Sequence, residues 1–397
     1  MTPDLIELGS PSPWAVLPPG IHDTTLTEVE ARFATTPHRK WLFNGFVRMV
    51  QALSAAGCRY VYLDVLSGIP RTTAFVFAIY NNGAQFSGSL VGDAQVASNI
   101  ETGVQAARLY EAWIEHGFAG DRGSLKFGLY DLNTEFDALE ASSLFIGSAH
   151  GIGTDFSQTG LNGPSIFPST SLAARLELLP TEGLKMRGAM LDAVPNDPDR
   201  PARTLLRLSG REGALFIGEA EYHRSPNRVI AGYWRYSATF IDTLESAKTR
   251  SIQTANGNEG YYLRGETRLT DRDNASLNAF ARIGRASGRF NDYDLFASAG
   301  ITQTGLLFGR EKDKSGLAFA YARSSQSSRK LAEINGERRG PSEIAFELTH
   351  RLVLSEASAI QPNMQYIVSP GADSSVKNAL VFWIRFEFGW SSRKSFP

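Results

Sequence analysis

The chain has 397 residues, enough for one large domain or for two to three ordinary ones. Its 40 basic and 41 acidic residues leave a formal charge of −1, which argues against a nucleic-acid partner because such proteins usually carry a basic excess. The mean hydropathy is −0.19 and no long apolar run occurs, so a transmembrane helix is excluded, whereas strands of alternating polarity would hardly change this average.

Residues 1–70 are expected to form a short α/β segment. The first twenty residues have no basic n-region and no apolar core, so no signal peptide is expected in the sequence as given. Thr25 and Glu28 fit a capping box that opens a helix through Phe33. A second helix is predicted over residues 37–57 and a strand over residues 59–64. The single cysteine, Cys58, excludes an internal disulfide.

From Arg71 onward the hydrophobic period changes from 3.6 to 2, which indicates strands. About fourteen alternating stretches follow, each bounded by turn residues. They are residues 72–80, 107–117, 123–131, 171–179, 183–194, 214–224, 227–240, 259–270, 275–287, 294–308, 314–325, 342–354, 358–369 and 378–390.

The last stretch shows the alternation most clearly. Phe382, Ile384 and Phe386 share one face, whereas Arg385 and Glu387 share the other. A soluble sandwich that buries its apolar faces would give the same pattern. Two features favour a membrane barrel instead: strands of ten to thirteen residues, and connections that alternate between short and long. The sequence therefore predicts an all-β fold, an antiparallel transmembrane β-barrel preceded by the short α/β segment.

Four stretches carry a resemblance to a known family. They are Gly92-Asp93-Ala-Gln-Val-Ala-Ser-Asn99-Ile100, Arg108-Leu-Tyr110-Glu111-Ala-Trp113-Ile-Glu115, Lys126-Phe-Gly128-Leu-Tyr130-Asp131-Leu-Asn133-Thr-Glu135-Phe136-Asp137 and Gly160-Leu-Asn-Gly163-Pro164-Ser165-Ile-Phe167-Pro168. Together they resemble the carbohydrate-selective porins of Gram-negative outer membranes (the OprB type), over about residues 72–397. The resemblance implies a barrel of about sixteen strands in the outer membrane that admits mono- or oligosaccharides by diffusion. It implies no enzymatic activity and no cofactor, and it leaves a homotrimer open.

The N-terminal residues depart from this family. Leu17-Pro-Pro-Gly20 through Tyr62-Leu63-Asp64 resembles the beginning of a small nucleotidyltransferase-like family of unknown function, without the metal-binding acids that should follow. We therefore expect two domains: residues 1–70, an incomplete helix-helix-strand fragment, and residues 71–397, a porin-like barrel that lacks its first strands. The alternative is a non-functional or soluble fusion product.

The stretch from Leu132 to Thr170 lacks clear alternation, and the resemblance implies that it folds into the lumen and narrows it. Its acids Glu135, Asp137, Glu140 and Asp155 are candidates for the constriction, although an ordinary exposed loop is the alternative. Opposite them we expect basic residues from the strands and aromatic residues that stack on sugars, because guanidinium groups and carboxylates pair well with hydroxyls. The alternative, favoured for any single arginine, is that these charges keep a wide lumen wet and pair with each other. These candidates are Lys126, Arg175, Lys185, Arg187, Arg264, Arg268, Arg282, Arg351, Arg385, Trp113, Trp234 and Trp383.

Other motifs that would indicate an enzyme are missing from the sequence. The six histidines do not have metal-ligand spacing, so no metal site is expected. Neither a phosphate-binding loop nor a Gly-x-Ser-x-Gly nucleophile motif occurs.

Overall fold

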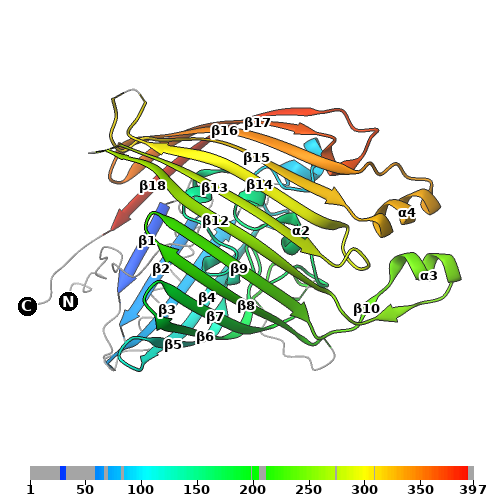
Figure 1. The fold of residues 1–397 in the computed structure, drawn as a ribbon, viewed down its shortest axis with the longest axis horizontal. Helices are drawn as coiled ribbons and strands as arrows, with labels where there is room; N and C mark the ends of the chain where they lie inside the picture. Colours follow the sequence, from blue (N-terminus) through cyan, green and yellow to red (C-terminus); the bar gives the residue numbers. More distant parts are fainter. Residues whose placement is uncertain are drawn as a thin grey trace, which may run out of the picture.

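The computed structural model describes residues 27–32, 59–66, 70–81, 85–197, 199–204, 212–272, 275–307 and 309–391. All fourteen predicted strands are present, and each pairs antiparallel with its neighbour in the chain (Figure 1). Their bounds are β3 Thr72–Asn81, β4 Ala106–Phe118, β5 Gly123–Tyr130, β6 Ser171–Thr181, β7 Leu184–Asp192, β8 Ala214–Arg224, β9 Asn227–Tyr236, β12 Glu259–Arg272, β13 Ala275–Ala286, β14 Tyr293–Thr304, β15 Lys314–Ser324, β16 Ser342–Ser355, β17 Ser358–Val368 and β18 Ala379–Ser391.

Two strands from the N-terminal segment complete a closed barrel of sixteen. The predicted strand is confirmed as β2 (Arg59–Leu66), which pairs antiparallel with β3. The alternation therefore leaves β2 and β18 pointing the same way, and β1 (Thr27–Arg32) fills the gap parallel to both. The prediction of a helix from Thr25 to Phe33 is wrong over residues 27–32, which form the strand β1. Pairing with β2 and β18 outweighs the local capping signal. The predicted helix over residues 37–57 lies outside the described residues.

The two faces of the wall settle the choice between sandwich and barrel. In β18, Phe382, Ile384 and Phe386 are 67%, 63% and 45% exposed, whereas Arg385 and Glu387 are buried. The same arrangement, with apolar side chains exposed and polar side chains buried, recurs along β12, β13 and β16. A water-soluble sandwich would bury the apolar side, so this arrangement belongs to a barrel with an apolar exterior and a polar interior.

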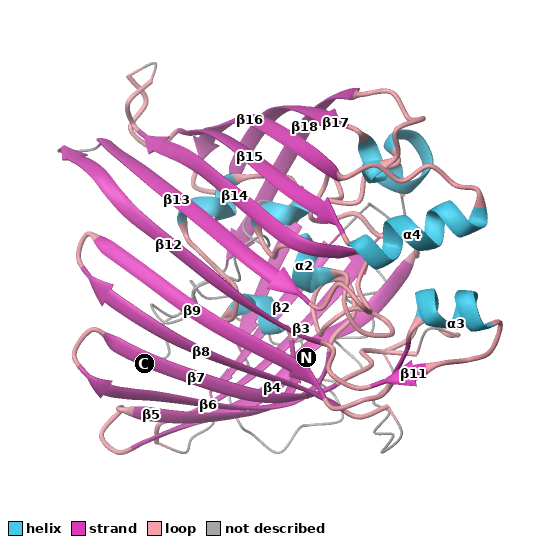
Figure 2. Cartoon of the chain, turned by 45° about the vertical axis from the view of Figure 1, so that its right-hand side comes forward, coloured by secondary structure: helices cyan, strands magenta, loops and turns pink. Residues whose placement is uncertain are grey.

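The connections confirm the predicted alternation of short and long. Short turns join β4 to β5, β6 to β7 and β16 to β17 at one rim. At the other rim, long loops carry β10 (Phe240–Ile241), β11 (Thr254–Ala255), α3 (Thr243–Thr249) and α4 (Gln326–Asn335), which project beyond the strands (Figures 1 and 2). No helix among the described residues is long and apolar enough to cross a membrane.

The loop between β5 and β6, residues 131–170, turns into the barrel and packs there as short helical turns (Figure 2). Those turns are η3 Leu132–Thr134, η4 Ala141–Leu144, η5 Ser148–His150 and α2 Thr154–Ser157. Phe156 stacks on Trp234 of β9 with ring centroids 4.9 Å apart, and Phe145 packs on Phe280 of β13. The predicted inward fold of this segment is therefore what the structure shows, and we call residues 131–170 the inward loop.

Candidate functional site

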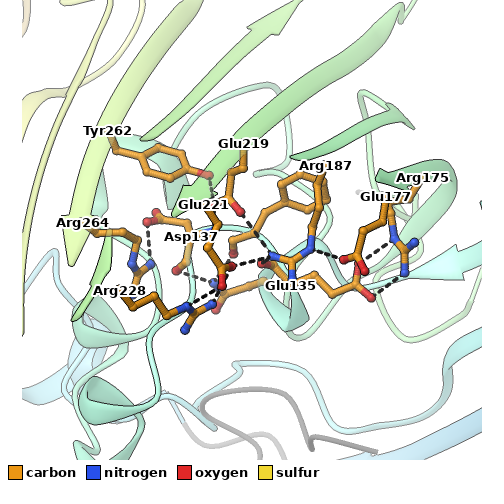
Figure 3. A network of polar contacts seen from close by, with 12 residues as sticks. Glu135, Asp137, Arg175, Glu177, Arg187, Glu219, Glu221, Arg228, Tyr262 and Arg264 are labelled. Carbon is orange, nitrogen blue, oxygen red and sulfur yellow. Dashed lines mark hydrogen bonds and ion pairs between the residues drawn. The ribbon is translucent and has the colours of Figure 1, made fainter. Parts of the chain in front are cut away.

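Glu135 anchors the start of the inward loop to the barrel wall. Its carboxylate accepts hydrogen bonds from Lys126 Nζ of β5 (2.5 Å) and from Arg175 Nε of β6 (2.7 Å). Arg187 of β7 donates to the Glu135 carbonyl at 3.0 Å and to Glu177 at 2.6 Å (Figure 3). Three of the predicted wall cations therefore meet the first predicted loop acid in direct contact.

Asp137 and Asp155 hold the middle of the loop to β12 and β13. Asp137 accepts from Arg264 Nη1 at 2.6 Å and from Arg282 Nε and Nη2, both at 2.8 Å. Arg282 also donates to Asp155 at 2.7 Å. All four side chains are buried, so these charges form a closed ion network rather than a surface open to solute.

The surroundings of the loop acids set their charge. Burial favours the neutral form of Glu135, but Lys126 and Arg175 outweigh it and hold the pKa of this carboxyl well below its usual range. Arg282 and Arg264 likewise overcome burial at Asp137 and lower its pKa. At Asp155 burial dominates and the pKa is raised, because Arg282 is shared with Asp137. Glu135 and Asp137 are therefore ionised carboxylates at neutral pH.

Wall carboxylates that the sequence analysis did not select hold the loop backbone. Glu219 of β8 accepts from the Asp137 N–H at 2.7 Å, and Glu266 of β12 accepts from the Ala141 N–H at 2.8 Å. Glu347 of β16 accepts from the N–H groups of Ile146 and Gly147 at 2.6 and 3.0 Å. Glu266 and Glu347 lie on the charged side of the alternation in the stretches 259–270 and 342–354, so this pattern could have identified them.

A second loop, between β3 and β4, also enters the barrel. Glu343 of β16 accepts from the Ala94 and Gln95 N–H groups at 2.8 and 2.9 Å. Arg385 of β18 is buried and donates to Asn99 at 2.6 Å. The Ser148 N–H of the inward loop donates to the Val96 carbonyl, so the two loops brace each other inside the barrel.

The remaining candidates make other contacts, and one of them, Trp113, lies against the ion network at Lys126. Trp113 stacks on Phe75 with ring centroids 4.7 Å apart and lies 4.1 Å from Lys126 Nζ, so its ring is already covered. Arg351 pairs with Glu387 of β18. Glu140 and Arg268 are exposed, and Lys185 is half-buried.

Among the described residues, no three His, Cys, Asp or Glu side chains are placed to hold a metal ion. Over residues 61–389 the chain matches the family described as carbohydrate-selective porin, OprB family. The chain belongs to this porin family. It is an outer-membrane carbohydrate channel, and not an enzyme.

Two relatives of this porin agree with the assignment. Porin B of Pseudomonas aeruginosa is 21% identical over 359 residues, which are 80% of this chain and 77% of that protein. The solved structure of Pseudomonas putida OprB superposes with a TM-score of 0.69 at 20% identity, covering 80% of this chain and 82% of that one. At this level of identity the structural likeness shows the fold alone.

The porin's N-terminal segment matches a second family. Residues 12–64 match a family of unknown function, and the nucleotidyltransferase-like character expected there stays a prediction. The porin match begins at residue 61, inside β2, so both matches include residues 61–64 of that strand.

Proposed function

We propose that sugars cross this porin passively, through the part of the lumen that the inward loop and the loop between β3 and β4 leave open. The observation that carries the proposal is the inward loop itself, which is fixed at Glu135 and Asp137 by paired wall cations. A loop held at several points forms a constriction of constant size, which suits diffusion. The ion pairs therefore shape the channel, and other groups contact the solute.

The proposed sugar contacts are three polar side chains that are exposed or half-buried, one on the inward loop and two on the wall. Glu140 lies on the loop and is exposed, next to the Ala141 N–H that Glu266 holds. Arg268 on β12 and Lys185 on β7 belong to the inward-facing positions of their strands. Carboxylates accept hydrogen bonds from sugar hydroxyls and the cations donate to them, so together these groups replace the water that a sugar loses on entry.

The exterior supports membrane insertion of the same chain. Large apolar side chains, including Ile283, Leu317 and Phe346, are 52%, 52% and 46% exposed on the outer face. Such a band would be unstable in water but suits the hydrocarbon of a bilayer. We propose that this band is in contact with lipid.

Sugar block of single-channel ion current tests the proposed contacts. In planar bilayers, a maltooligosaccharide should reduce the current of the wild type, and Glu140→Gln combined with Arg268→Gln should raise the half-blocking concentration several-fold. Lys330→Gln on α4, an exposed loop cation, is the control and should leave the block unchanged. Equal block in all three proteins would overturn the assignment of these contacts.

A further inference from the structure

A continuous row of outward-facing residues crosses five strands of the wall. Directly opposed pairs link Gly188 of β7 to Gly218 of β8, and Gly218 to Tyr233 of β9. The row continues to Tyr261 of β12 and Arg285 of β13. Gly188 lies in the middle of its strand, whereas Arg285 is next to the last residue of β13. The row therefore climbs from mid-wall to the rim that carries the long loops.

The lower part of this row is an apolar groove of about 490 Å³ on the lipid side of the barrel. Its floor contains Ala174, Gly188 and Gly218, and Phe216 and Tyr233 border it toward the rim. The missing side chains of the two glycines create the depression, since the nearest atoms to an added Cβ would lie 3.9 Å away at Gly188 and 3.7 Å away at Gly218.

Cations lie where the groove reaches the rim. Arg235 is opposed to Phe216 across β8 and β9 and is 55% exposed, with Glu259 at 3.7 Å. Arg285 is exposed, and no carboxylate among the described residues lies within ion-pair distance of it. Two strand spacings and an offset of two residues along the strands separate Arg235 from Arg285, so the two side chains are anchored about 12 Å apart.

The order along this face matches the order of groups in a lipid. An apolar groove comes first, then Tyr233 and Tyr261 at the height where aromatic residues meet the membrane interface, and then the cations. Long loops mark the extracellular rim of an outer-membrane barrel, so the lipid would belong to the outer leaflet. Guanidinium groups bind phosphate with charge-assisted hydrogen bonds.

We propose that this face binds a phosphorylated glycolipid of the outer leaflet. One acyl chain lies in the groove over Gly188 and Gly218, and a headgroup phosphate lies against Arg235 and Arg285. The site is on the outside of the wall and is independent of the sugar contacts in the lumen.

Native mass spectrometry of the full chain in detergent tests the proposal, with bis-phosphorylated lipid A as the probe. The wild type should retain lipid A, and Arg235→Gln combined with Arg285→Gln should weaken this retention about tenfold, because charged hydrogen bonds are lost. Gly218→Leu should weaken it as well by filling the groove. Arg71→Gln at the opposite rim and Met364→Phe on β17 are the matched controls and should retain lipid A as the wild type does.

Three results would overturn the proposal. The first is equal retention by the wild type and the double arginine variant. The second is equal retention of lipid A and of dephosphorylated lipid A or phosphatidylglycerol, which would contradict the phosphorylated glycolipid. The third is that Gly218→Leu abolishes an oligomer while lipid A retention is unchanged, which would make the groove a contact between copies of the chain.

Discussion

Asp137 links the inward loop to three strands of the wall, β8, β12 and β13. It accepts from Arg264 and Arg282, and its own N–H is held by Glu219. From the sequence, Asp137, Arg264 and Arg282 are candidates for sugar contact, whereas the structure pairs them with one another. Alternation shows which way a strand residue points, whereas the register between the loop and strands more than one hundred residues away is fixed only by folding.

Asp137→Asn should destabilise the folded barrel by about 3–5 kcal/mol, because it leaves buried guanidinium groups without their counter-charge. Loosening of the loop should also increase the noise of the open-channel current. Urea titration followed by tryptophan fluorescence measures the first effect and planar bilayers measure the second. Glu140→Gln, a change to an exposed acid of the same loop, should leave stability within about 0.5 kcal/mol of the wild type.

Asp93 on the second loop gives a pH dependence of stability. Burial raises the pKa of Asp93 to about 6, from the usual 3.8. The folded chain therefore binds a proton more readily than the unfolded chain, so this residue's contribution to stability falls as the pH rises from about 4 to 6.

Asp93→Asn should accordingly be more stable than the wild type at pH 7, by on the order of 3 kcal/mol, and the difference should shrink toward pH 4. Urea titrations of both proteins across this range measure it. A difference that does not change with pH would contradict the assignment to this carboxyl.

At the scale of the element, strands were easier to predict than the segments between them. Fourteen strands followed from alternation because the lipid and the lumen impose opposite polarity on successive side chains. The strand β1 could not be predicted this way, since six residues are too short to distinguish a strand from a helix by period. The inward loop was recognised by its lack of alternation, but its helical turns form against the wall.

A cation on the lipid face of a strand should be far more costly than one on a loop. Leu317 of β15 and Ile334 of α4 are equally exposed, at 52%. Leu317→Arg should reduce stability in bilayers by about 2–4 kcal/mol, because it places a charge in the hydrocarbon, and Ile334→Arg should have little effect. Urea-dependent folding into lipid vesicles compares them, and equal losses would contradict the membrane placement of the wall.

At the scale of the whole molecule, the closed wall binds both the inward loop and the loop between β3 and β4. Glu343 and Glu347 on β16 each hold one loop by backbone N–H groups, and the loops contact each other between them. The family resemblance predicted a barrel of about sixteen strands, and β1 and β2 bring the fourteen strands found by alternation to that number. Local patterns did not show this, because closure depends on which strand edges are left unpaired.

Liposome swelling tests the central claim, that this chain is a carbohydrate channel, most directly. Proteoliposomes containing the folded chain should swell in isotonic monosaccharide, and more slowly as the sugar becomes larger. Liposomes without protein are the control. A chain that is folded in the membrane but leaves the liposomes impermeable to every sugar would contradict the account.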